Sequence, residues 1–173
     1  IEAVALRPDC DQELLVADVD VRGASGLLRL YVSDGDGVQV GSVAVAVEEG
    51  AVPEGADPAG PARRRVRLTV PVPRPRRWSP DDPHLYDLTL RYGSDAVHSY
   101  TAFRTVEVAP DAHGVFRFLL NGEPLLLRGV LDQGYWSDGL MTAPSDEALA
   151  FDIQAMREAG FNMLRKHLKV EAD

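Results

Sequence analysis

The sequence predicts a mostly β fold: an immunoglobulin-like antiparallel β-sandwich, followed by an incomplete βαβ unit that would begin a (β/α)8 barrel. Two observations predict the sandwich. Residues 1–109 contain about seven short segments in which apolar residues recur at every second position, with turn residues between them. No helical period occurs among these segments. A third observation predicts the βαβ unit, because beyond residue 136 the apolar period becomes that of a helix.

The strands of the sandwich are predicted from alternation along the chain. In one segment, for example, Leu15, Ala17, Val19 and Val21 would share a single face of an extended strand. The absence of a Cys-Trp-Cys pattern excludes an antibody-type domain. The predicted strands are residues 3–6, 13–21, 28–32, 38–47, 66–70, 84–92 and 97–108, the last being one strand or a bent pair.

Two stretches rich in glycine are predicted to be loops. Residues 33–37, SDGDG, form a turn, and the Pro, Gly and Ala content of residues 50–62 is typical of a longer loop. Asp34 and Asp36 could instead bind calcium, but no distal glutamate follows to complete the ligand set. A plain turn is therefore the favoured interpretation.

Arginines are concentrated in residues 63–67 and 74–77. They could form a phosphate-binding patch. Alternatively they form a solvated strand face, since Arg65 and Arg67 alternate with apolar residues. The net charge of −9 favours the strand face, and it argues against nucleic acid or an anionic membrane as a partner.

Residues 116–131 predict a hairpin that leads into a buried strand. Apolar residues alternate in residues 116–120, and Asn121-Gly122 supplies residues that accept the positive φ angles of a tight turn. The nearly all-apolar run at residues 125–131 then predicts a strand with both faces covered.

A helix is predicted between Ser145, a good N-cap, and Gly160, which suits the C-terminal stop. Residues 161–164 resemble another strand, so strand, helix and strand make one βαβ unit with a parallel pair. We therefore expect two domains, a sandwich at residues 1–109 and a barrel portion at residues 110–173.

The sequence gives no sign of a cofactor or a metal. Cys10 is the only cysteine, which excludes an intrachain disulfide and a cysteine zinc cluster. His84, His98 and His113 lack the spacing of metal ligands, and no serine-nucleophile or nucleotide motif occurs. No apolar run approaches the roughly 20 residues of a membrane helix. We expect neither a cofactor nor a membrane partner, and the sequence leaves the cellular compartment open.

A series of short motifs runs in order from residue 78 to the C-terminus. It comprises Trp78-Ser79-Pro80, Pro83 to Tyr86, Phe103 to Val106, Phe118 to Leu125, Arg128-Gly129-Val130, and Asp152 followed by Gly160 to Arg165. This series resembles glycoside hydrolase family 2, the family of β-galactosidases, β-glucuronidases and β-mannosidases. The earlier strands match that family only by their place and pattern.

The resemblance implies a modular retaining glycosidase in which sandwich domains precede a catalytic (β/α)8 barrel. One glutamate protonates the leaving oxygen, and a second, roughly 5 Å away, attacks the anomeric carbon. Both glutamates come from later barrel strands, so we expect no catalytic residue in this segment. Residues 110–173 would supply the leading hairpin and the first two barrel strands.

The resemblance also implies where the sugar site begins. Arg165 matches the arginine of the family's Asn-x-x-Arg motif and would hold the nucleophile carboxylate ionised. Where the family often has a His-Glu pair, this chain has Gln133-Gly134, which argues against β-galactosidase specificity. Tyr135 and Trp136 would either stack on the sugar or plug the barrel mouth. The expected substrate-binding residues are Arg165, Asp132, Asn162, His167, Trp136 and Tyr135.

We therefore expect a segment of a retaining glycoside hydrolase that acts on β-linked sugars and is inactive alone. The alternative is a non-catalytic β-sandwich that binds carbohydrate or protein. Because the chain begins with Ile and holds one βαβ unit, we expect it to be part of a longer protein. A lone βαβ unit leaves apolar side chains in water, so we also expect this tail to pack on the sandwich or to form a homo-oligomer.

Overall fold

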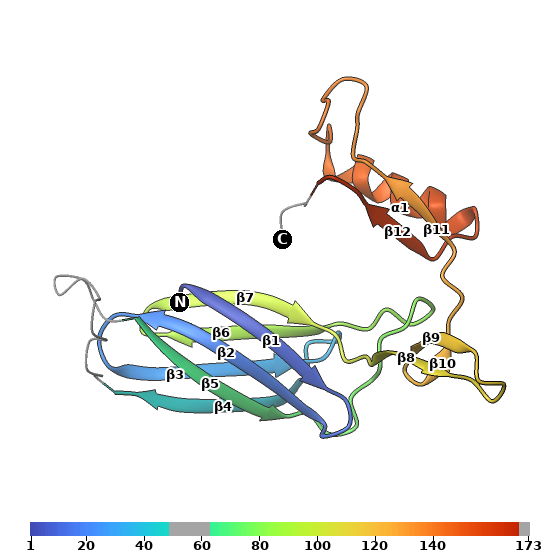
Figure 1. Ribbon diagram of the computed structural model, residues 1–173. Coiled ribbons are helices and arrows are strands. Elements are labelled where there is room, and N and C mark those ends of the chain that lie inside the picture. Colours follow the sequence, from blue (N-terminus) through green and yellow to red (C-terminus); the bar gives the residue numbers. More distant parts are fainter. Residues whose placement is uncertain (49–62, 170–173) are drawn as a thin grey trace. The chain divides into compact units, whose positions relative to one another are not determined.

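The computed structural model describes residues 1–48 and 63–169. The loop predicted at residues 50–62 lies outside the described residues. The chain divides into two compact units, residues 1–106 and residues 107–173. Figure 1 shows the helix and the strands of both units.

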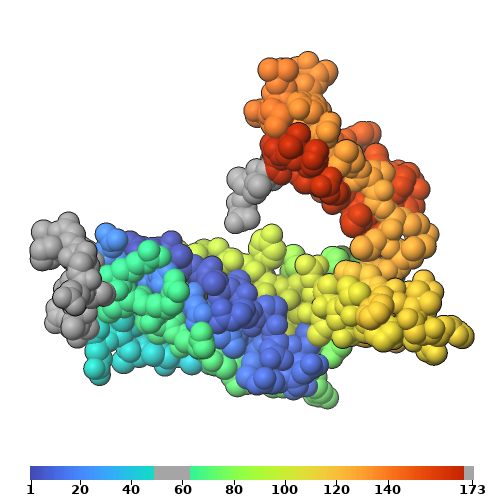
Figure 2. Space-filling view, in the orientation of Figure 1, coloured from blue at the N-terminus to red at the C-terminus, as the bar shows by residue number. Residues whose placement is uncertain are grey.

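The first unit is a sandwich of two antiparallel sheets, as the alternation predicts. Its described strands form a three-stranded sheet in the order β1-β2-β5 and a four-stranded sheet in the order β4-β3-β6-β7 (Figure 1). Figure 2 shows the blue residues of β1 and β2 beside the green residues of β5 on one outer surface of this unit. The strands are β1 Ala3–Asp9, β2 Leu14–Arg22, β3 Gly26–Ser33, β4 Gln39–Val47, β5 Arg63–Pro71, β6 Tyr86–Tyr92 and β7 Asp95–Thr101.

The core of the sandwich is built from the strand faces that the period of two predicts. Leu15, Ala17, Val19 and Val21 of β2 are all 0 % exposed, which confirms the predicted inner face of that strand. Burying each side chain of the Val or Leu type stabilises the fold by about 1.5–3 kcal/mol. The facing sheet contributes residues that are equally inaccessible, among them Leu28, Leu30, Val32 and Leu90.

The Trp- and Pro-rich stretch before β6 forms a packed corner of the sandwich. The buried Tyr86 hydroxyl accepts a hydrogen bond of 2.8 Å from the backbone N–H of Arg76. Its ring packs edge-on against Phe103, with 5.3 Å between ring centres. Trp78 donates its backbone N–H to the Phe103 carbonyl at 2.8 Å, and the Arg104 guanidinium lies 4.8 Å from the Trp78 ring centre. The corner therefore ties the segment after β7 to the start of β6.

The strand predicted at residues 97–108 is two strands. The sandwich strand β7 ends at Thr101, and β8 (Val106–Pro110) belongs to another sheet. That sheet has the order β10-β9-β8 and includes the predicted hairpin, with β9 at Phe116–Leu120 and β10 at Glu123–Pro124. Asn121 and Gly122 turn the hairpin at φ angles of 54° and 83°, as that dipeptide predicts.

The second unit also contains the predicted βαβ unit. β11 (Gly129–Asp132) and β12 (Met163–Lys166) pair in parallel, and α1 (Asp146–Glu158) connects them. The first of these strands is shorter than predicted, because residues 125–128 are not in a strand. The Arg128 N–H and the Leu126 carbonyl in this segment bind the Asn162 side chain, whereas the Leu125 N–H donates to the Phe118 carbonyl of β9 at 2.9 Å.

Helix α1 begins and ends where the sequence predicts. The Ser145 hydroxyl accepts a hydrogen bond of 3.2 Å from the N–H of Ala148, which caps the first turn. At the other end Gly160 has a φ of 87°, and its N–H donates to the Arg157 carbonyl at 3.0 Å. The N–H of Phe161 donates to the carbonyl of Met156 at 3.0 Å, which completes a Schellman motif.

In the described part of the chain, no helix has the length and the apolar character needed to cross a membrane.

Candidate functional site

The candidate site lies where β11 and β12 end. The register pairs Leu131 with Arg165 and Asp132 with Lys166, so the carboxyl ends of the two strands coincide. The backbone N–H of His167 donates to the Asp132 carbonyl at 2.8 Å, which extends the pairing by one residue. In parallel barrels, this edge of the sheet carries substrate-binding side chains.

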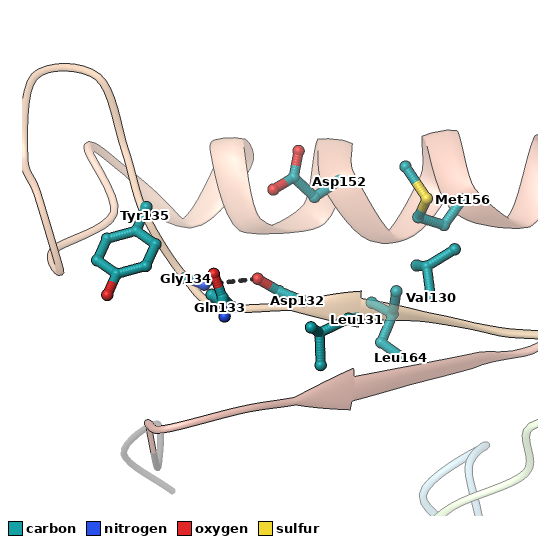
Figure 3. A pocket seen from close by; sticks show the side chains of 9 residues that line it. All are labelled: Val130, Leu131, Asp132, Gln133, Gly134, Tyr135, Asp152, Met156 and Leu164. Carbon is teal, nitrogen blue, oxygen red and sulfur yellow. Dashed lines mark hydrogen bonds between the residues drawn. The ribbon is translucent and has the colours of Figure 1, made fainter.

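A cavity of about 350 Å³ opens beside these strand ends (Figure 3). The carboxyl end of β11 and the segment after it form one wall, and α1 forms the other. In Figure 3 Val130 points toward the helix, whereas Leu131 points away from it. The lining residues are Val130, Leu131, Asp132, Gln133, Gly134, Tyr135, Asp152, Met156 and Leu164.

Both carboxylate oxygens of Asp132 are engaged. One accepts a hydrogen bond of 2.7 Å from the backbone N–H of Gly134, and the other lies 2.6 Å from the Lys166 ammonium. The Lys166 ammonium is the main reason why the pKa of Asp132 is lowered, while partial burial opposes the shift. Asp132 is therefore held ionised and fixes the turn of the chain that follows β11.

The structure brings Arg165 and His167 to the same edge of the strand pair. Arg165 is exposed, and because successive residues of a strand alternate, its side chain lies on the face opposite Leu164 and Lys166. The His167 Nδ1 lies 3.5 Å from the Nε2 of Gln133. This contact between His167 and Gln133 links the ends of the two strands through side chains.

Asn162 lies at the other end of the strand pair, which differs from the expectation that it joins Arg165. It precedes β12, and its Oδ1 accepts a hydrogen bond of 2.8 Å from the N–H of Arg128. Its Nδ2 donates to the Leu126 carbonyl at 3.0 Å. These bonds hold residues 126 and 128 of the irregular segment before β11.

The two aromatic residues after β11 have different surroundings. Tyr135 borders the cavity and is 64 % exposed. Trp136 is half-buried. Its backbone N–H and carbonyl both form hydrogen bonds with the backbone of Leu140, which makes an isolated β-bridge. Within the described residues its indole Nε1 is inaccessible and has no hydrogen-bond partner. Tyr135 is thus available for stacking on a ligand, whereas Trp136 is partly withdrawn from solvent and its backbone is held by Leu140.

The sequence did not single out Lys166 or Asp152 for this site. Lys166 directly follows Arg165, and its pairing with Asp132 depends on the strand register. Asp152 belongs to one of the motifs in the sequence, and the helical period places it on the side of α1 that faces the cavity. The first assignment needs the register of the two strands, and the second needs the packing of α1 on the strand pair.

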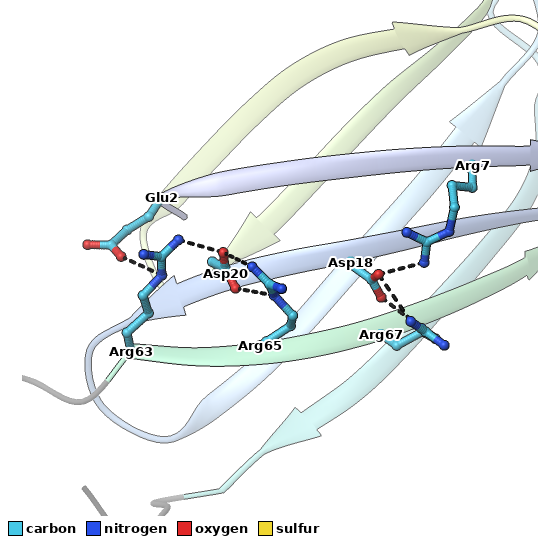
Figure 4. Close-up of polar contacts among 7 residues, drawn as sticks. All are labelled: Glu2, Arg7, Asp18, Asp20, Arg63, Arg65 and Arg67. Carbon is cyan, nitrogen blue, oxygen red and sulfur yellow. Dashed lines mark hydrogen bonds and ion pairs between the residues drawn. The ribbon is translucent and has the colours of Figure 1, made fainter. Parts of the chain in front are cut away.

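The arginine-rich strand β5 was the other candidate site. Arg65 donates to both oxygens of Asp20, at 2.8 and 2.9 Å, and Arg63 donates to one of them at 2.6 Å (Figure 4). Arg67 donates to Asp18 at 2.7 and 3.2 Å. Because each of these guanidinium groups already binds a carboxylate, the solvated strand face accounts for them better than a phosphate site does.

The turn at residues 33–37 is likewise explained without a ligand. One oxygen of Asp34 accepts hydrogen bonds from the N–H groups of Asp36 and Val38, at 3.1 and 2.9 Å. Among the described residues, no group of three or more His, Cys, Asp or Glu side chains could hold a metal ion.

A sequence model of the glycosyl hydrolases family 2 matches residues 1–104, which is more than half of the chain. The chain belongs to this family. A β-galactosidase of Enterobacter cloacae is 29 % identical over 171 residues, covering 92 % of this chain and 15 % of the relative. A β-galactosidase of Psychromonas ingrahamii is 31 % identical over 115 residues, covering 63 % of this chain and 10 % of the relative. The family 2 chain thus spans a small part of the length of these relatives.

Solved structures of similar fold cover both units of this family 2 chain. The family 2 β-galacturonidase of Eisenbergiella tayi has a TM-score of 0.73 at 18 % identity, covering 97 % of this chain and 28 % of that one. A putative β-galactosidase of Bacteroides fragilis has a TM-score of 0.70 at 18 % identity, covering 98 % and 25 %. At this level of identity the likeness establishes the fold: a β-sandwich followed by the start of a barrel.

Proposed function

We propose that this chain is a segment of a retaining glycoside hydrolase that acts on β-linked sugars in carbohydrate metabolism. The observation that carries the proposal is the group of polar side chains at the carboxyl ends of a parallel strand pair, in a chain of family 2. The catalytic glutamates would come from further barrel strands, so the 173 residues alone would be inactive. Residues 1–109 would be the immunoglobulin-like domain and residues 110–173 the first portion of the barrel.

Arg165 is the residue with the clearest proposed role. Its exposed guanidinium lies on the strand face opposite the helix, and in a closed (β/α)8 barrel that face points to the interior. A guanidinium there can donate two hydrogen bonds to one carboxylate and keep it ionised. The nucleophile of a retaining glycosidase must be ionised to attack the anomeric carbon.

The other proposed substrate-binding residues divide by position. His167 and Tyr135 lie at the carboxyl ends of the strands and would contact the sugar directly, the tyrosine by stacking. Trp136 would support the wall behind Tyr135. Asp132 and Asn162, whose polar atoms bind the protein itself, would act on the sugar site through the backbone that they fix.

The exposed apolar residues of the βαβ unit support the proposal that more structure covers it. Leu131 and Met163 are exposed on the strand face opposite the helix. Phe151 and Ile153 are exposed on the two flanks of α1, where a barrel would place neighbouring helices. We propose that further barrel elements cover these residues in the longer protein, and that a second copy covers them when the 173 residues are alone.

Hydrolysis of a panel of nitrophenyl β-glycosides tests the proposal. The longer protein should release nitrophenol from at least one of them, and the 173-residue chain should release none. Arg165→Ala in the longer protein should lower kcat/KM by about 100-fold or more, because an oriented charge contact to the reacting groups is lost. Arg157→Ala, on the exposed side of α1, is the matched control and should change kcat/KM less than about twofold. A longer protein that binds glycans but hydrolyses none would favour a non-catalytic sandwich module.

A further inference from the structure

The strand pair presents two rows of side chains on opposite faces. Asp132 and Lys166 are register partners and contact each other on the face that packs against α1. Leu131 and Arg165, the preceding partners, lie on the other face. The pairing continues through the bond from the His167 N–H to the Asp132 carbonyl, so His167 follows Arg165 on that second face.

Gln133 completes this second row. It directly follows β11, it is exposed, and its Nε2 reaches to 3.5 Å from the His167 Nδ1. A carboxamide offers both a donor and an acceptor, which is the combination that neighbouring sugar hydroxyls require. When its NH₂ group donates to Nδ1, the proton of the neutral imidazole sits on Nε2 and can be donated to a sugar oxygen.

Asp132 is poorly suited to the same task because its oxygens are already occupied. One binds the Gly134 N–H and the other binds the Lys166 ammonium. Gly134 is buried and has a φ of 67°, a conformation that favours glycine, and the Asp132 bond holds the chain in this turn. The pair therefore sets the direction in which Gln133 leaves the strand.

We propose that Gln133 is a substrate-contacting residue that acts together with His167 on sugar hydroxyls, and that the Asp132–Lys166 ion pair is the positioning element behind them. This inference rests on the proposed glycosidase function. It assigns contact with the sugar to Gln133 together with His167, and it names Lys166 as the partner through which Asp132 supports them.

The test uses the longer protein with Gln133→Ala, His167→Ala and the double variant. Each single change should lower kcat/KM by about 10- to 100-fold, and the double variant should lose less than the product of the two, because the residues act as a unit. Gln154→Ala, an exposed glutamine of α1, is the matched control and should stay within about twofold of the wild type. The melting temperature of each variant should match that of the wild type.

Asp132→Asn provides the complementary measurement. It should accelerate hydrogen exchange of the backbone amides in residues 133–136, and Lys166→Met should do the same, because either change removes the charge pair. Gln133→Ala should leave that exchange unchanged. If Asp132→Asn lowers kcat/KM without changing the exchange, Asp132 contacts the substrate and the assignment of the two rows is wrong.

Different results would overturn the proposed glycosidase function and the proposed role of Gln133. A wild-type protein that hydrolyses no glycoside of the panel overturns the proposed function, and the sugar-binding role of Gln133 with it. An active wild type whose Gln133→Ala variant keeps its kcat/KM and its melting temperature overturns the present inference alone.

Discussion

The Asn162 side-chain oxygen accepts a hydrogen bond of 2.8 Å from the backbone N–H of Arg128, just before the first barrel strand begins. The same side chain donates to the Leu126 carbonyl at 3.0 Å. One residue thereby satisfies two peptide groups of an irregular segment, which would otherwise need a neighbouring strand or water. This pairing gives a structural reason for an asparagine at the start of β12.

Asn162→Ala should destabilise the second unit by about 1–2 kcal/mol, because both hydrogen bonds to the irregular segment are lost. Hydrogen exchange of the Arg128 amide should accelerate, which mass spectrometry of peptides covering residues 125–132 would detect. Asn162→Asp is the matched control, since a carboxylate can still accept from Arg128 but cannot donate to Leu126. A loss of stability for Asn162→Asp that lies between those of the wild type and Asn162→Ala supports these two hydrogen bonds. Equal hydrogen exchange in the wild type and both variants contradicts them.

The sandwich could be predicted because each of its strands buries one face, and the period of two records that burial directly, as in Leu15 and Val19. The helix limits could also be predicted, since Ser145 and Gly160 act locally. The irregular segment at residues 125–128 could not. Its leucines fit a strand, and its actual conformation depends on Asn162, which is distant in sequence.

The candidate site likewise contains residues that could be predicted from the sequence and contacts that could not. Arg165 and His167 could be predicted because a motif and a strand end mark their positions. The partnership of Asp132 with Lys166 could not, since it follows from the register of two strands that are separated by a helix. The proximity of Gln133 and His167 depends on the same register.

Acid should weaken the sandwich through Asp20 and Asp18. Hydrogen bonds from Arg65 and Arg63 are the main cause that lowers the pKa of Asp20, and bonds from Arg67 and Arg7 lower that of Asp18. A carboxyl whose pKa is lower in the folded state stabilises the fold above its unfolded pKa, about 3.9 for Asp. This contribution is lost as the pH falls below that value toward the folded pKa.

We therefore expect the urea midpoint of the wild type to fall steeply between about pH 4 and about pH 2. The double variant with Asp18→Asn and Asp20→Asn should start from a lower midpoint at neutral pH and show a shallower fall. Asp81→Asn, at an exposed position in the corner, should follow the wild-type curve. Parallel curves for the wild type and the double variant would show that these carboxylates do not govern acid stability.

Tyr86→Phe should destabilise the sandwich by about 1–2 kcal/mol, because the N–H of Arg76 loses the hydroxyl that accepts its hydrogen bond. The edge-on packing against Phe103 does not involve the hydroxyl and should remain. Tyr100→Phe removes a hydroxyl from a residue that is 66 % exposed and should change the unfolding free energy by less than about 0.5 kcal/mol. Urea unfolding of the chain compares the two, and similar values would contradict the role of the Tyr86 hydroxyl.

Gly41→Ala should be the most destabilising single methyl addition among the strands of the sandwich. A Cβ at Gly41 in β4 would lie 2.6 Å from the Val70 Cγ1 and 2.7 Å from the Pro71 carbonyl oxygen. Since Val70 is fully buried and the carbonyl belongs to the backbone, neither neighbour can move without disturbing β5. Such overpacking costs about 1–3 kcal/mol.

Gly26→Ala in β3 is the control for this prediction. Its nearest neighbour would be the Tyr92 ring at 3.5 Å, an ordinary contact distance. This variant should be neutral, or more stable by up to about 1 kcal/mol, because alanine reduces the entropy of the unfolded chain. The melting temperatures of the two variants should therefore shift from the wild-type value in different directions or by clearly different amounts. Equal losses would mean that glycine is needed at both positions for backbone reasons, and that the close approach of β4 to β5 is not what selects it at Gly41.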